Sequence, residues 1–404
     1  MNLDDMDEEK AGFLYVHIPY CLRKCAYCDF YSIPLSGEDV TAYVEALKRE
    51  MLLRRGEIGT IRSVYIGGGT PTAIGEMHLL SLLDFAARNF SIRADAEITV
   101  EANPSTIDGP MLKTLAGGGV NRLSLGVQSL VDSELAALGR LHNGNDARIA
   151  MNRVGKHFDN YSVDLIYALP GQTTESWEST LREIAALAPP HVSAYELTPE
   201  RGTPLGEAIL SGRADIPSED TVVSMYCLAV DFLEGKSYGH YEISNYALPG
   251  RECLHNLNYW QRGQYVGIGA AAHSFVDETR SANPGDVAGY RRALNSGKIG
   301  SAMEALEEAL PVSRDITRIG ETERIEEIVF LALRTSAGLS LKRLDKRFHK
   351  RLLAAGSPVI ADMVEEGLIR FDGDRLSLTN KGMLLSNQVI VGIIRMLLPP
   401  LSEP

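Results

Sequence analysis

Three cysteines in the stretch HIPYCLRKCAYCDF are the residues whose type and spacing point most directly to chemistry. Cys21, Cys25 and Cys28 are separated by three residues and then by two. Three thiolates on a short loop can hold three corners of a four-iron, four-sulfur cluster, which leaves one iron open to a small chelating molecule. Zinc is the competing metal, but a structural zinc site uses four protein ligands. No fourth cysteine or histidine lies at finger spacing nearby.

The composition favours a protein of a reducing compartment. The 404 residues include only five cysteines, unevenly placed, which does not resemble a disulfide framework. The start, MNLDDMDEEK, lacks the features of a secretion signal, and the late apolar run VIVGIIRMLL is interrupted by Arg395 and is too short to span a bilayer. A net charge of −13 argues against a broad nucleic-acid footprint. We therefore expect a cytoplasmic protein with no transmembrane segment and no nucleic-acid partner.

Short runs rich in β-branched residues alternate with longer amphipathic runs, which is the pattern of a parallel sheet flanked by helices. The expected strands cover residues 14–18, 63–66, 97–101, 122–127, 162–166 and 192–197. Expected helices include residues 39–54, 77–89, 175–187 and 219–233. These strand–helix units predict an α/β fold, a partial (β/α)6 barrel, because two further units needed for a closed barrel of eight are not evident.

Polar residues follow these strands. The strand ends carry GGGTP at 67–71, EANP at 101–104, Gln128-Ser129, Asp164 and Glu196, and the first strand runs into the cysteine loop. Because the loops after the strands of such barrels build the active site, we expect acids, amides and a glycine-rich turn around the metal. GGGTPT lacks the lysine of a P-loop and the spaced glycines of a dinucleotide fingerprint. Its glycines would instead let the backbone approach a polar cofactor closely.

Together these motifs resemble a known protein family. CLRKCAYC resembles the cluster loop of the radical S-adenosylmethionine superfamily, and GGGTPT, EANP, GVQS and DLIYALPGQT resemble its branch around the oxygen-independent coproporphyrinogen III oxidase, most closely the haem chaperones of that branch. The resemblance covers residues 14–275, with a weaker likeness in the C-terminal region. It implies a 4Fe-4S cluster whose unique iron is chelated by S-adenosylmethionine, which the cluster can cleave to a 5′-deoxyadenosyl radical.

The resemblance also implies a set of cofactor-binding residues. Carried over motif by motif, these are Tyr15, Tyr27, Gly69, Thr70, Pro71, Glu101, Gln128, Arg140 and Asp164. The two tyrosines would lie beside S-adenosylmethionine, and the glycine turn would contact its methionine part or a neighbouring ligand. The carboxylates suit ribose hydroxyls, and Arg140 suits a carboxylate. Any one of these side chains could instead serve packing or a local hydrogen bond.

Two departures separate the chain from the oxidase. The oxidase has a further cysteine two residues after the third cluster ligand, where this chain has Phe30, and it has a long segment before the cluster loop, whereas Tyr15 here lies near the start. Both differences favour the chaperone and place the oxidation of a porphyrinogen in doubt.

A second group of residues suits a macrocycle. The stretch CLHNLNYW, residues 253–260, is followed by YVGIGAAAHS with His273. A histidine and a cysteine near tyrosine and tryptophan can supply an axial ligand and flat apolar partners. Residue types alone favour a structural role for His255, but the resemblance implies that HNLNYW is a haem-binding motif with His255 as the ligand. Cys253 is a candidate second ligand or attachment point, although the CxxCH signature of c-type haem is absent.

From about Glu304 the helices carry charged faces, so we divide the chain into residues 1–300 and a mostly helical, winged-helix-like domain over 301–404. Asp372-Gly373-Asp374 is expected at the tip of a β-wing. Only residues 342–351 are strongly basic, which favours a lid or partner-docking role over DNA binding.

The leading hypothesis is therefore a haem chaperone that holds a cluster with S-adenosylmethionine and delivers haem to acceptor haemoproteins, including acceptors at the membrane surface. In this hypothesis the cluster regulates homodimerisation or haem release. The alternative is a radical enzyme of the coproporphyrinogen oxidase type acting on a porphyrin-like substrate. A nucleic-acid-binding regulator with a redox-sensing cluster is a more distant third class. The sequence identifies neither the acceptor nor the second haem ligand, and leaves open whether S-adenosylmethionine is turned over.

Overall fold

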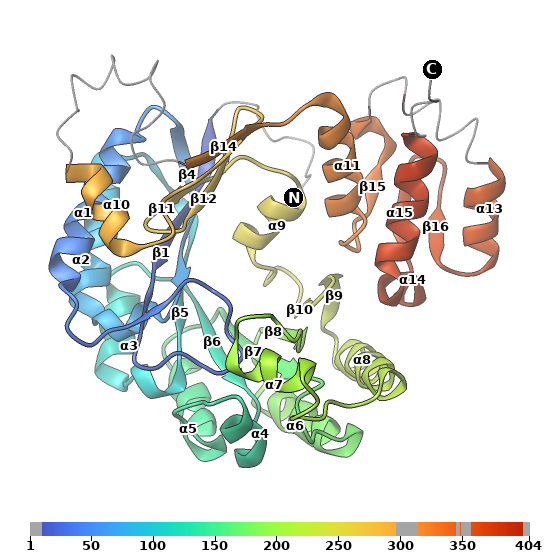
Figure 1. Ribbon diagram of the computed structural model, residues 1–404, viewed down its shortest axis with the longest axis horizontal. Coiled ribbons are helices and arrows are strands. Elements are labelled where there is room, and N and C mark those ends of the chain that lie inside the picture. Colours follow the sequence, from blue (N-terminus) through green and yellow to red (C-terminus); the bar gives the residue numbers. More distant parts are fainter. Residues whose placement is uncertain (1–9, 296–313, 345–347, 349–356, 399–404) are drawn as a thin grey trace. The chain divides into compact units, whose positions relative to one another are not determined.

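The computed structural model describes residues 10–295, 314–344, 348 and 357–398 (Figure 1). They fall into two units whose sequences are interlaced. The first unit contains the described residues up to 217 together with 264–318, and the second contains 218–263 together with those from 319 onward. The division at residue 300 expected from the sequence follows the order of the chain. The spatial division differs from it by grouping residues 218–263 with the C-terminal part.

The first unit is built on a parallel sheet. Its strands lie in the order β11-β1-β4-β5-β6-β7-β8, and the pairings between these neighbours are parallel. The strands are β1 (Ala11–Ile18), β4 (Ile58–Gly68), β5 (Ile92–Ala102), β6 (Arg122–Gln128), β7 (Tyr161–Tyr167), β8 (His191–Glu196) and β11 (Val266–Ile268). The first six overlap the six strands expected from the sequence, which confirms the partial (β/α)6 barrel. The short strand β11, at the edge beside β1, was not predicted.

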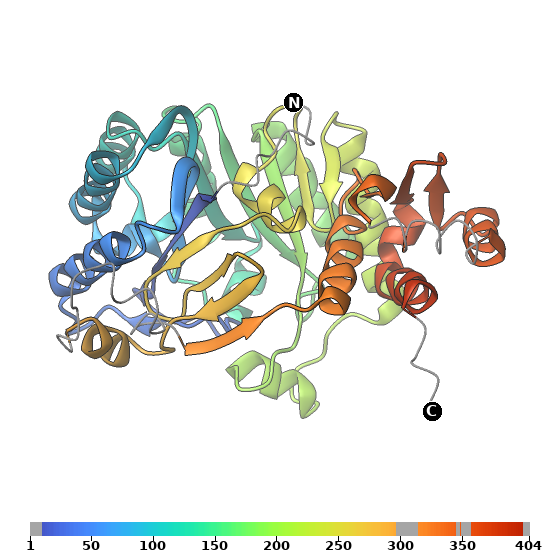
Figure 2. The same cartoon turned by 90° about the horizontal axis from the view of Figure 1, so that it is seen from above.

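Helices cover the outer face of this curved sheet (Figures 1 and 2). They are α1 (Val40–Leu53), α2 (Glu76–Asn89), α3 (Gly109–Gly117), α4 (Asp132–Ala137), α5 (Gly144–Val154) and α6 (Thr174–Leu187). Helix α7 (Pro204–Leu210) follows β8 and packs through Leu205 against the cysteine loop. Helix α6 shows why they form. The Thr173 hydroxyl accepts a hydrogen bond from the Ser176 N–H and caps the first turn, and Trp177, Leu181 and Ile184 are buried at helical spacing.

Smaller elements complete the first unit. They are β2 (Tyr20–Cys21), β3 (Ile33–Pro34), the 3₁₀ turns η1 (Pro71–Ile74) and η2 (Pro104–Thr106), β12 (His273–Val276), β13 (Thr279–Ala282), β14 (Arg314–Arg318) and α10 (Val287–Asn295). Strands β12, β13 and β14 form a separate antiparallel sheet.

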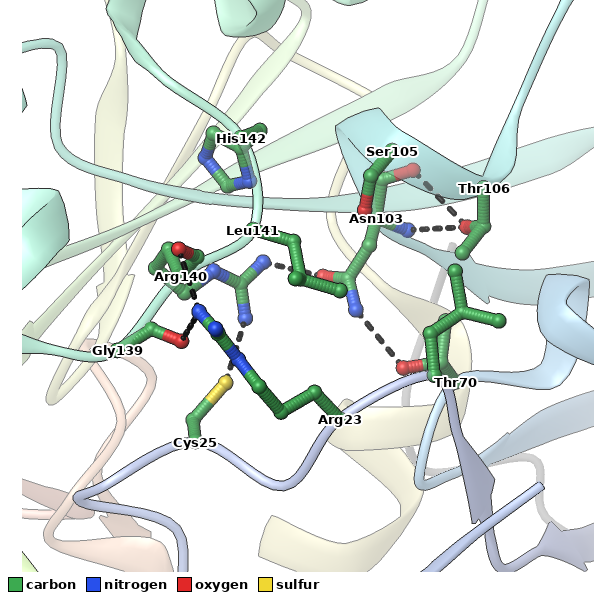
Figure 3. A pocket seen from close by; sticks show the side chains of 11 residues that line it. Arg23, Cys25, Thr70, Asn103, Ser105, Thr106, Gly139, Arg140, Leu141 and His142 are labelled. Atoms are coloured by element: carbon green, nitrogen blue, oxygen red, sulfur yellow. Dashed lines mark hydrogen bonds between the residues drawn. The ribbon is translucent and has the colours of Figure 1, made fainter. Parts of the chain in front are cut away.

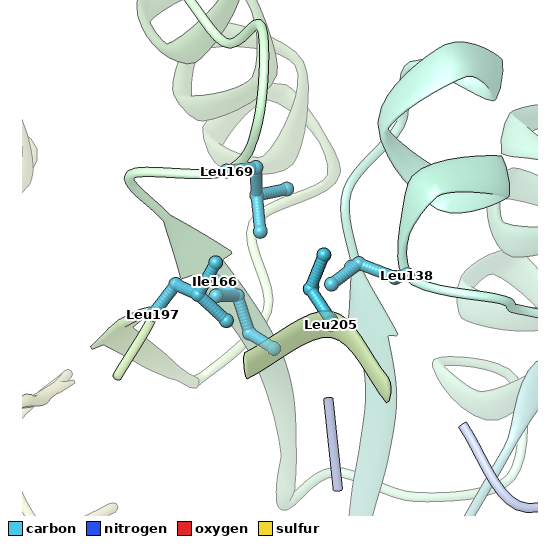
Figure 4. Close-up of a cluster of buried hydrophobic side chains, with 5 residues drawn as sticks. All are labelled: Leu138, Ile166, Leu169, Leu197 and Leu205. Atoms are coloured by element: carbon cyan, nitrogen blue, oxygen red, sulfur yellow. The ribbon is translucent and has the colours of Figure 1, made fainter. Parts of the chain in front are cut away.

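A cluster of buried apolar side chains lies beneath the cysteine loop (Figure 4). It consists of Leu138, Ile166, Leu169, Leu197 and Leu205, against which Ala26 and Tyr27 pack. Backbone hydrogen bonds join the loop to the same elements, from the Ala26 N–H to the Leu138 carbonyl at 3.1 Å and from the Leu205 N–H to the Ala26 carbonyl at 2.8 Å. The middle of the cysteine loop is therefore fixed by packing and by backbone bonds that need no metal.

The second unit is mainly helical. Its elements are α8 (Glu219–Glu234), β9 (Gly239–Glu242), β10 (Asn245–Ala247), α9 (Leu254–Trp260), α11 (Glu321–Ala332), β15 (Leu339–Ser340), η3 (Leu341–Arg343), α13 (Ser357–Glu365), β16 (Ile369–Phe371), β17 (Arg375–Leu378), α14 (Asn380–Leu384) and α15 (Ser386–Leu397). Strands β16 and β17 form the expected wing, and the Asp372 carboxylate accepts the N–H groups of Asp374 and Arg375 at its tip. Part of the basic segment 342–351 lies outside the described residues.

In the part of the chain that the structure describes, every helix is too short or too polar to cross a lipid bilayer.

Candidate functional site

The glycine turn after β4 lies against the cysteine loop after β1. The Gly69 N–H donates to the Ile18 carbonyl and the Thr70 N–H to the Tyr20 carbonyl, both at 2.8 Å. A Cβ atom on Gly69 would lie 2.9 Å from the Tyr20 oxygen and 3.0 Å from the Cys21 sulfur. Only glycine permits this close approach, so the turn and the first cluster cysteine are fitted to one another. Pro71 follows directly and starts η1.

The three thiols act on one another electrostatically. Burial raises the pKa of the Cys21 and Cys28 thiols, and the neighbouring Cys25 raises both further. Among the described residues, no three His, Cys, Asp or Glu side chains are arranged to hold one metal ion. A single ion requires all ligands around one point, whereas a four-iron cluster presents separate iron atoms to separate thiolates. Three neighbouring thiols on a fixed loop fit the cluster, whose iron would supply the positive charge that their deprotonation needs.

Beside Cys25 lies a small pocket that is open to solvent (Figure 3). Its lining is Leu22, Arg23, Cys25, Thr70, Asn103, Ser105, Thr106, Gly139, Arg140, Leu141 and His142. Arg140 Nη1 lies 3.4 Å from the Cys25 sulfur, and Thr70 Oγ1 lies 3.6 Å from the Cys21 sulfur. This lining contains two arginines, hydroxyls and an amide but no acid. The electrostatics therefore suit the carboxylate end of a ligand next to the cysteines.

Glu101 lies at the end of β5 and is held by two donors. Its Oε1 accepts the Tyr65 hydroxyl at 2.9 Å, and its Oε2 accepts the Gly68 N–H at 3.0 Å. Burial raises the pKa of Glu101 to about 7, although the two hydrogen bonds act to lower it. The carboxylate is thus positioned at the glycine turn and titrates near neutral pH.

We expect Glu101 to make the unliganded protein less stable as the pH rises from 4.5 to 7. In that range the unfolded carboxyl, with a pKa near 4.5, has released its proton while the folded one retains it. The folded state therefore binds more protons, and the unfolding free energy falls with rising pH. The loss is at most about 3 kcal/mol and levels off above pH 7. Urea unfolding of the parent and of Glu101→Gln at several pH values gives the unfolding free energy of each protein as a function of pH. We expect the curve of the parent to fall relative to that of the variant as the pH rises from 4.5 to 7. Parallel curves would contradict the assignment.

Asp164 and Gln128 lie on neighbouring strands, Asp164 in the middle of β7 and Gln128 at the end of β6. The Asp164 carboxylate accepts the hydroxyls of Ser124, Ser162 and Ser193, each at 2.7 Å, so its orientation is fixed by three strands. Gln128 has a left-handed φ of 69°, and the pairing of β6 with β7 shifts register between Gly126 and Gln128. Such a backbone costs a non-glycine residue about 1–2 kcal/mol, and strain of this kind concentrates at functional sites.

The two tyrosines of the expected set have different surroundings. The Tyr15 hydroxyl lies 3.0 Å from His17 Nδ1, and His17 Nε2 lies 3.0 Å from the Tyr31 carbonyl. Because burial lowers the pKa of His17 to about 4, the ring is neutral at pH 7, donates through Nε2 and accepts from Tyr15. Tyr27 packs against the apolar cluster under the loop, and its hydroxyl accepts a hydrogen bond from Arg140 near Cys25 and Cys28. Its ring therefore supports the cysteine loop from below.

The stretch that was expected to bind haem forms helix α9 of the second unit. Cys253 occupies the N-cap position directly before the helix and is fully buried; its N–H donates to the Tyr241 hydroxyl at 3.3 Å. His255 is 1% exposed, and its Nε2 lies 3.0 Å from the Tyr259 hydroxyl one turn later. His273 lies on β12 of the first unit and is exposed. The structure thus places His255 apart in sequence and unit from the expected cluster residues.

The cofactor-binding residues expected from the sequence did not include two side chains that lie beside the cysteines, Arg23 and Asn103. Arg23 Nη2 donates to the Gly139 and Arg140 carbonyls at 2.5 and 2.8 Å, which joins the cysteine loop to LGRLH. Asn103 donates to Thr70. Its position in the strand-end motif EANP was a usable signal, but a turn before proline explains an asparagine equally well. Nothing in the sequence pairs Arg23 with a loop more than a hundred residues away.

Comparison with known proteins identifies the family. The Radical SAM superfamily model matches residues 15–184, and that of the HemN C-terminal domain matches residues 319–385. A heme chaperone HemW of Bacillus subtilis is 36% identical over 379 residues, which cover 93% of this chain and 97% of the relative. The chain belongs to the HemW family of radical SAM proteins.

The family extends beyond bacteria. A mitochondrial radical S-adenosyl methionine domain-containing protein 1 of mouse is 34% identical over 96% of this chain and 88% of its own length. Among solved structures, coproporphyrinogen III oxidase HemN of Escherichia coli matches with a TM-score of 0.79 over 98% of this chain and 92% of its own, at 24% identity. The structural similarity to HemN confirms the fold, and the sequence identity with the HemW relatives shows the family.

Proposed function

We propose that this protein is a haem chaperone that binds a 4Fe-4S cluster, S-adenosylmethionine and haem, and transfers haem to acceptor haemoproteins. The observation that carries the proposal is the end-to-end likeness to heme chaperone HemW, 36% identical over 93% of this chain. The sequence departure at Phe30, where the oxidase has a further cysteine, supports the same choice.

In this proposal Cys21, Cys25 and Cys28 hold the cluster. The bound cluster supplies an open iron that chelates S-adenosylmethionine and an electron that can cleave it. The glycine turn offers backbone groups to the ligand, and Arg140 beside Cys25 favours its carboxylate. Glu101, held by Tyr65 and Gly68, and Asp164, held by three serines, present fixed acceptors for ribose hydroxyls. Gln128, at the end of β6, is the last of these proposed cofactor-binding residues.

Haem would bind through His255 in the second unit. A second potential ligand, Cys253, lies two positions earlier, directly before α9, and is also buried. Imidazole and thiolate are both axial ligands of haem iron. Delivery to acceptors at the membrane surface, a cytoplasmic location and a homodimer regulated by the cluster are further parts of the proposal.

A transfer assay tests the proposal. Reconstituted protein is loaded with haem, freed of excess and mixed with an apo-haemoprotein, and the holo-acceptor is followed by its absorbance spectrum. We expect stoichiometric transfer, faster than from haem-loaded serum albumin as a non-specific carrier. In parallel, the same protein is incubated with reductant, S-adenosylmethionine and coproporphyrinogen III.

The haem-transfer assay and the coproporphyrinogen III assay together distinguish the two candidate functions. A chaperone transfers haem and leaves coproporphyrinogen III unchanged. Repeated turnover to protoporphyrinogen IX with release of 5′-deoxyadenosine would overturn the proposal in favour of the oxidase-type enzyme. Absence of haem transfer together with absence of porphyrinogen turnover would contradict both.

A further inference from the structure

A continuous set of hydrogen bonds joins Cys25 to Cys21, two of the three proposed cluster ligands. Figure 3 shows the part of this set from Cys25 to Thr70. Arg140 Nη1 lies 3.4 Å from the Cys25 sulfur, and Arg140 Nη2 donates to Asn103 Oδ1. Asn103 Nδ2 donates to Thr70 Oγ1 at 2.8 Å, and Thr70 Oγ1 lies 3.6 Å from the Cys21 sulfur. Asn103 stands at the centre, since its amide oxygen contacts one half of this set and its amide nitrogen the other.

The direction of these bonds follows from the chemistry of the groups. A guanidinium can only donate, so Asn103 accepts through its oxygen and must present its NH₂ group to Thr70. A hydroxyl has a single proton. Because Thr70 accepts from Asn103, that proton remains available for the Cys21 sulfur. Asn103 therefore directs one N–H of Arg140 and the O–H of Thr70 towards two different sulfurs.

The surrounding backbone is shaped for this arrangement. Arg140 Nη2 also donates to the Gly126 carbonyl at 2.6 Å, and a Cβ atom on Gly126 would lie 2.9 Å from Asn103 Oδ1. A residue with a side chain at 126 would displace the amide. On the other side, the Asn103 N–H donates to Thr106 Oγ1 at 3.2 Å, and Thr106 contacts Thr72 in η1 at 2.6 Å. Asn103 is thus held at its backbone as well as at both ends of its side chain.

We infer that Asn103 is a positioning residue that keeps Arg140 and Thr70 hydrogen-bonded to the sulfurs of Cys25 and Cys21, and so sets the stability and the reduction potential of the cluster. The inference rests on the proposed cluster site. Hydrogen bonds to the sulfurs are among the factors that tune such clusters. They stabilise the more negative, reduced form, so their loss should make the potential more negative. Partners of this kind, one shell beyond the ligands, also hold the ligands in position.

The test uses Asn103→Leu, which keeps the approximate shape and the charge but removes both halves of the amide. We expect the reconstituted variant to lose iron to an added chelator about tenfold faster than the parent, and its midpoint potential to be more negative. Thr70→Val, which removes only the hydroxyl beside Cys21, should shift both quantities in the same direction. Circular dichroism of the apo-proteins checks that the variants fold.

Asn152→Leu is the matched control, because it makes the same substitution at an exposed residue of α5 outside the pocket, where the amide donates to the Arg148 carbonyl. We expect it to retain the iron-loss rate and potential of the parent. Parent-like values in both Asn103→Leu and Thr70→Val would overturn the inference while leaving the cluster itself established. A parent protein that assembles no cluster at all would instead defeat the proposed function, so the two failures are distinguishable.

Discussion

Replacement of Cys25 by alanine is expected to abolish the iron–sulfur cluster while the protein still folds. Cys25 supplies one of three proposed ligands, and two thiolates cannot fix a four-iron cluster that also keeps an open iron. The fold should persist because the neighbouring Ala26 is anchored by backbone hydrogen bonds to Leu138 and Leu205, and because Tyr27 packs into the apolar cluster regardless of residue 25. The effect should therefore be confined to metal binding.

Anaerobic reconstitution with iron and sulfide, followed by iron and sulfide determination and visible absorbance, measures the result. The parent should bind about four irons per chain, as a four-iron cluster requires, and Cys25→Ala should bind close to none in a stable form. Cys227→Ala is the matched control, since Cys227 is exposed on α8. An iron content unaffected by Cys25→Ala would refute the ligand assignment, and purified parent protein carrying zinc would refute the cluster.

The sheet could be predicted from the sequence because each long strand has its own signal. Strand β1, AGFLYVHI, is a mostly apolar run that is buried along most of its length, and such runs between amphipathic helices are typical of parallel sheets. Strand β11 has only three residues, Val266–Ile268, too few to show a period. It pairs with β1, which lies about 250 positions earlier in the chain, and no local sequence pattern indicates that pairing. The grouping of residues 218–263 with the C-terminal part could not be predicted for the same reason, because it depends on contacts between distant residues and not on local composition.

The site could be predicted as a set of strand ends but not as a network. Parallel strands bring their carboxyl ends to one rim, which is why Thr70 and Glu101 could be grouped in advance. Asp164 was expected at the same rim, but it lies in the middle of β7. What each side chain contacts depends on loop conformation. Asn103 fits a turn before proline, yet its amide also bridges Arg140 and Thr70. Tyr27 was expected beside the cofactor; its ring also packs on the apolar cluster that contains Leu205, a contact that no pattern in the sequence predicts.

Replacement of His255 by alanine is expected to abolish the shift of the haem absorbance band that accompanies binding. Imidazole is the axial ligand proposed for the iron, and the substitution removes it without adding a charge or bulk. His255 is 1% exposed, so haem can reach it only if the side chains around α9 move. His273→Ala is the matched control because His273 is exposed on β12 in the other unit, and it should bind haem like the parent.

Replacement of Tyr259 by phenylalanine is expected to tighten haem binding, which is the opposite of the effect expected for His255→Ala. The Tyr259 hydroxyl lies 3.0 Å from His255 Nε2, and the two rings meet edge to face at 5.0 Å. Haem iron that binds through Nε2 must displace this hydroxyl, which is a net cost of about 1 kcal/mol for a typical hydrogen bond. Removal of the hydroxyl should therefore tighten haem binding about fivefold in a titration, since 1.4 kcal/mol corresponds to a factor of ten. Unchanged affinity in both His255→Ala and Tyr259→Phe would show that haem binds elsewhere. Loss of binding in His255→Ala with unchanged affinity in Tyr259→Phe would retain the ligand but place the iron on the other ring nitrogen.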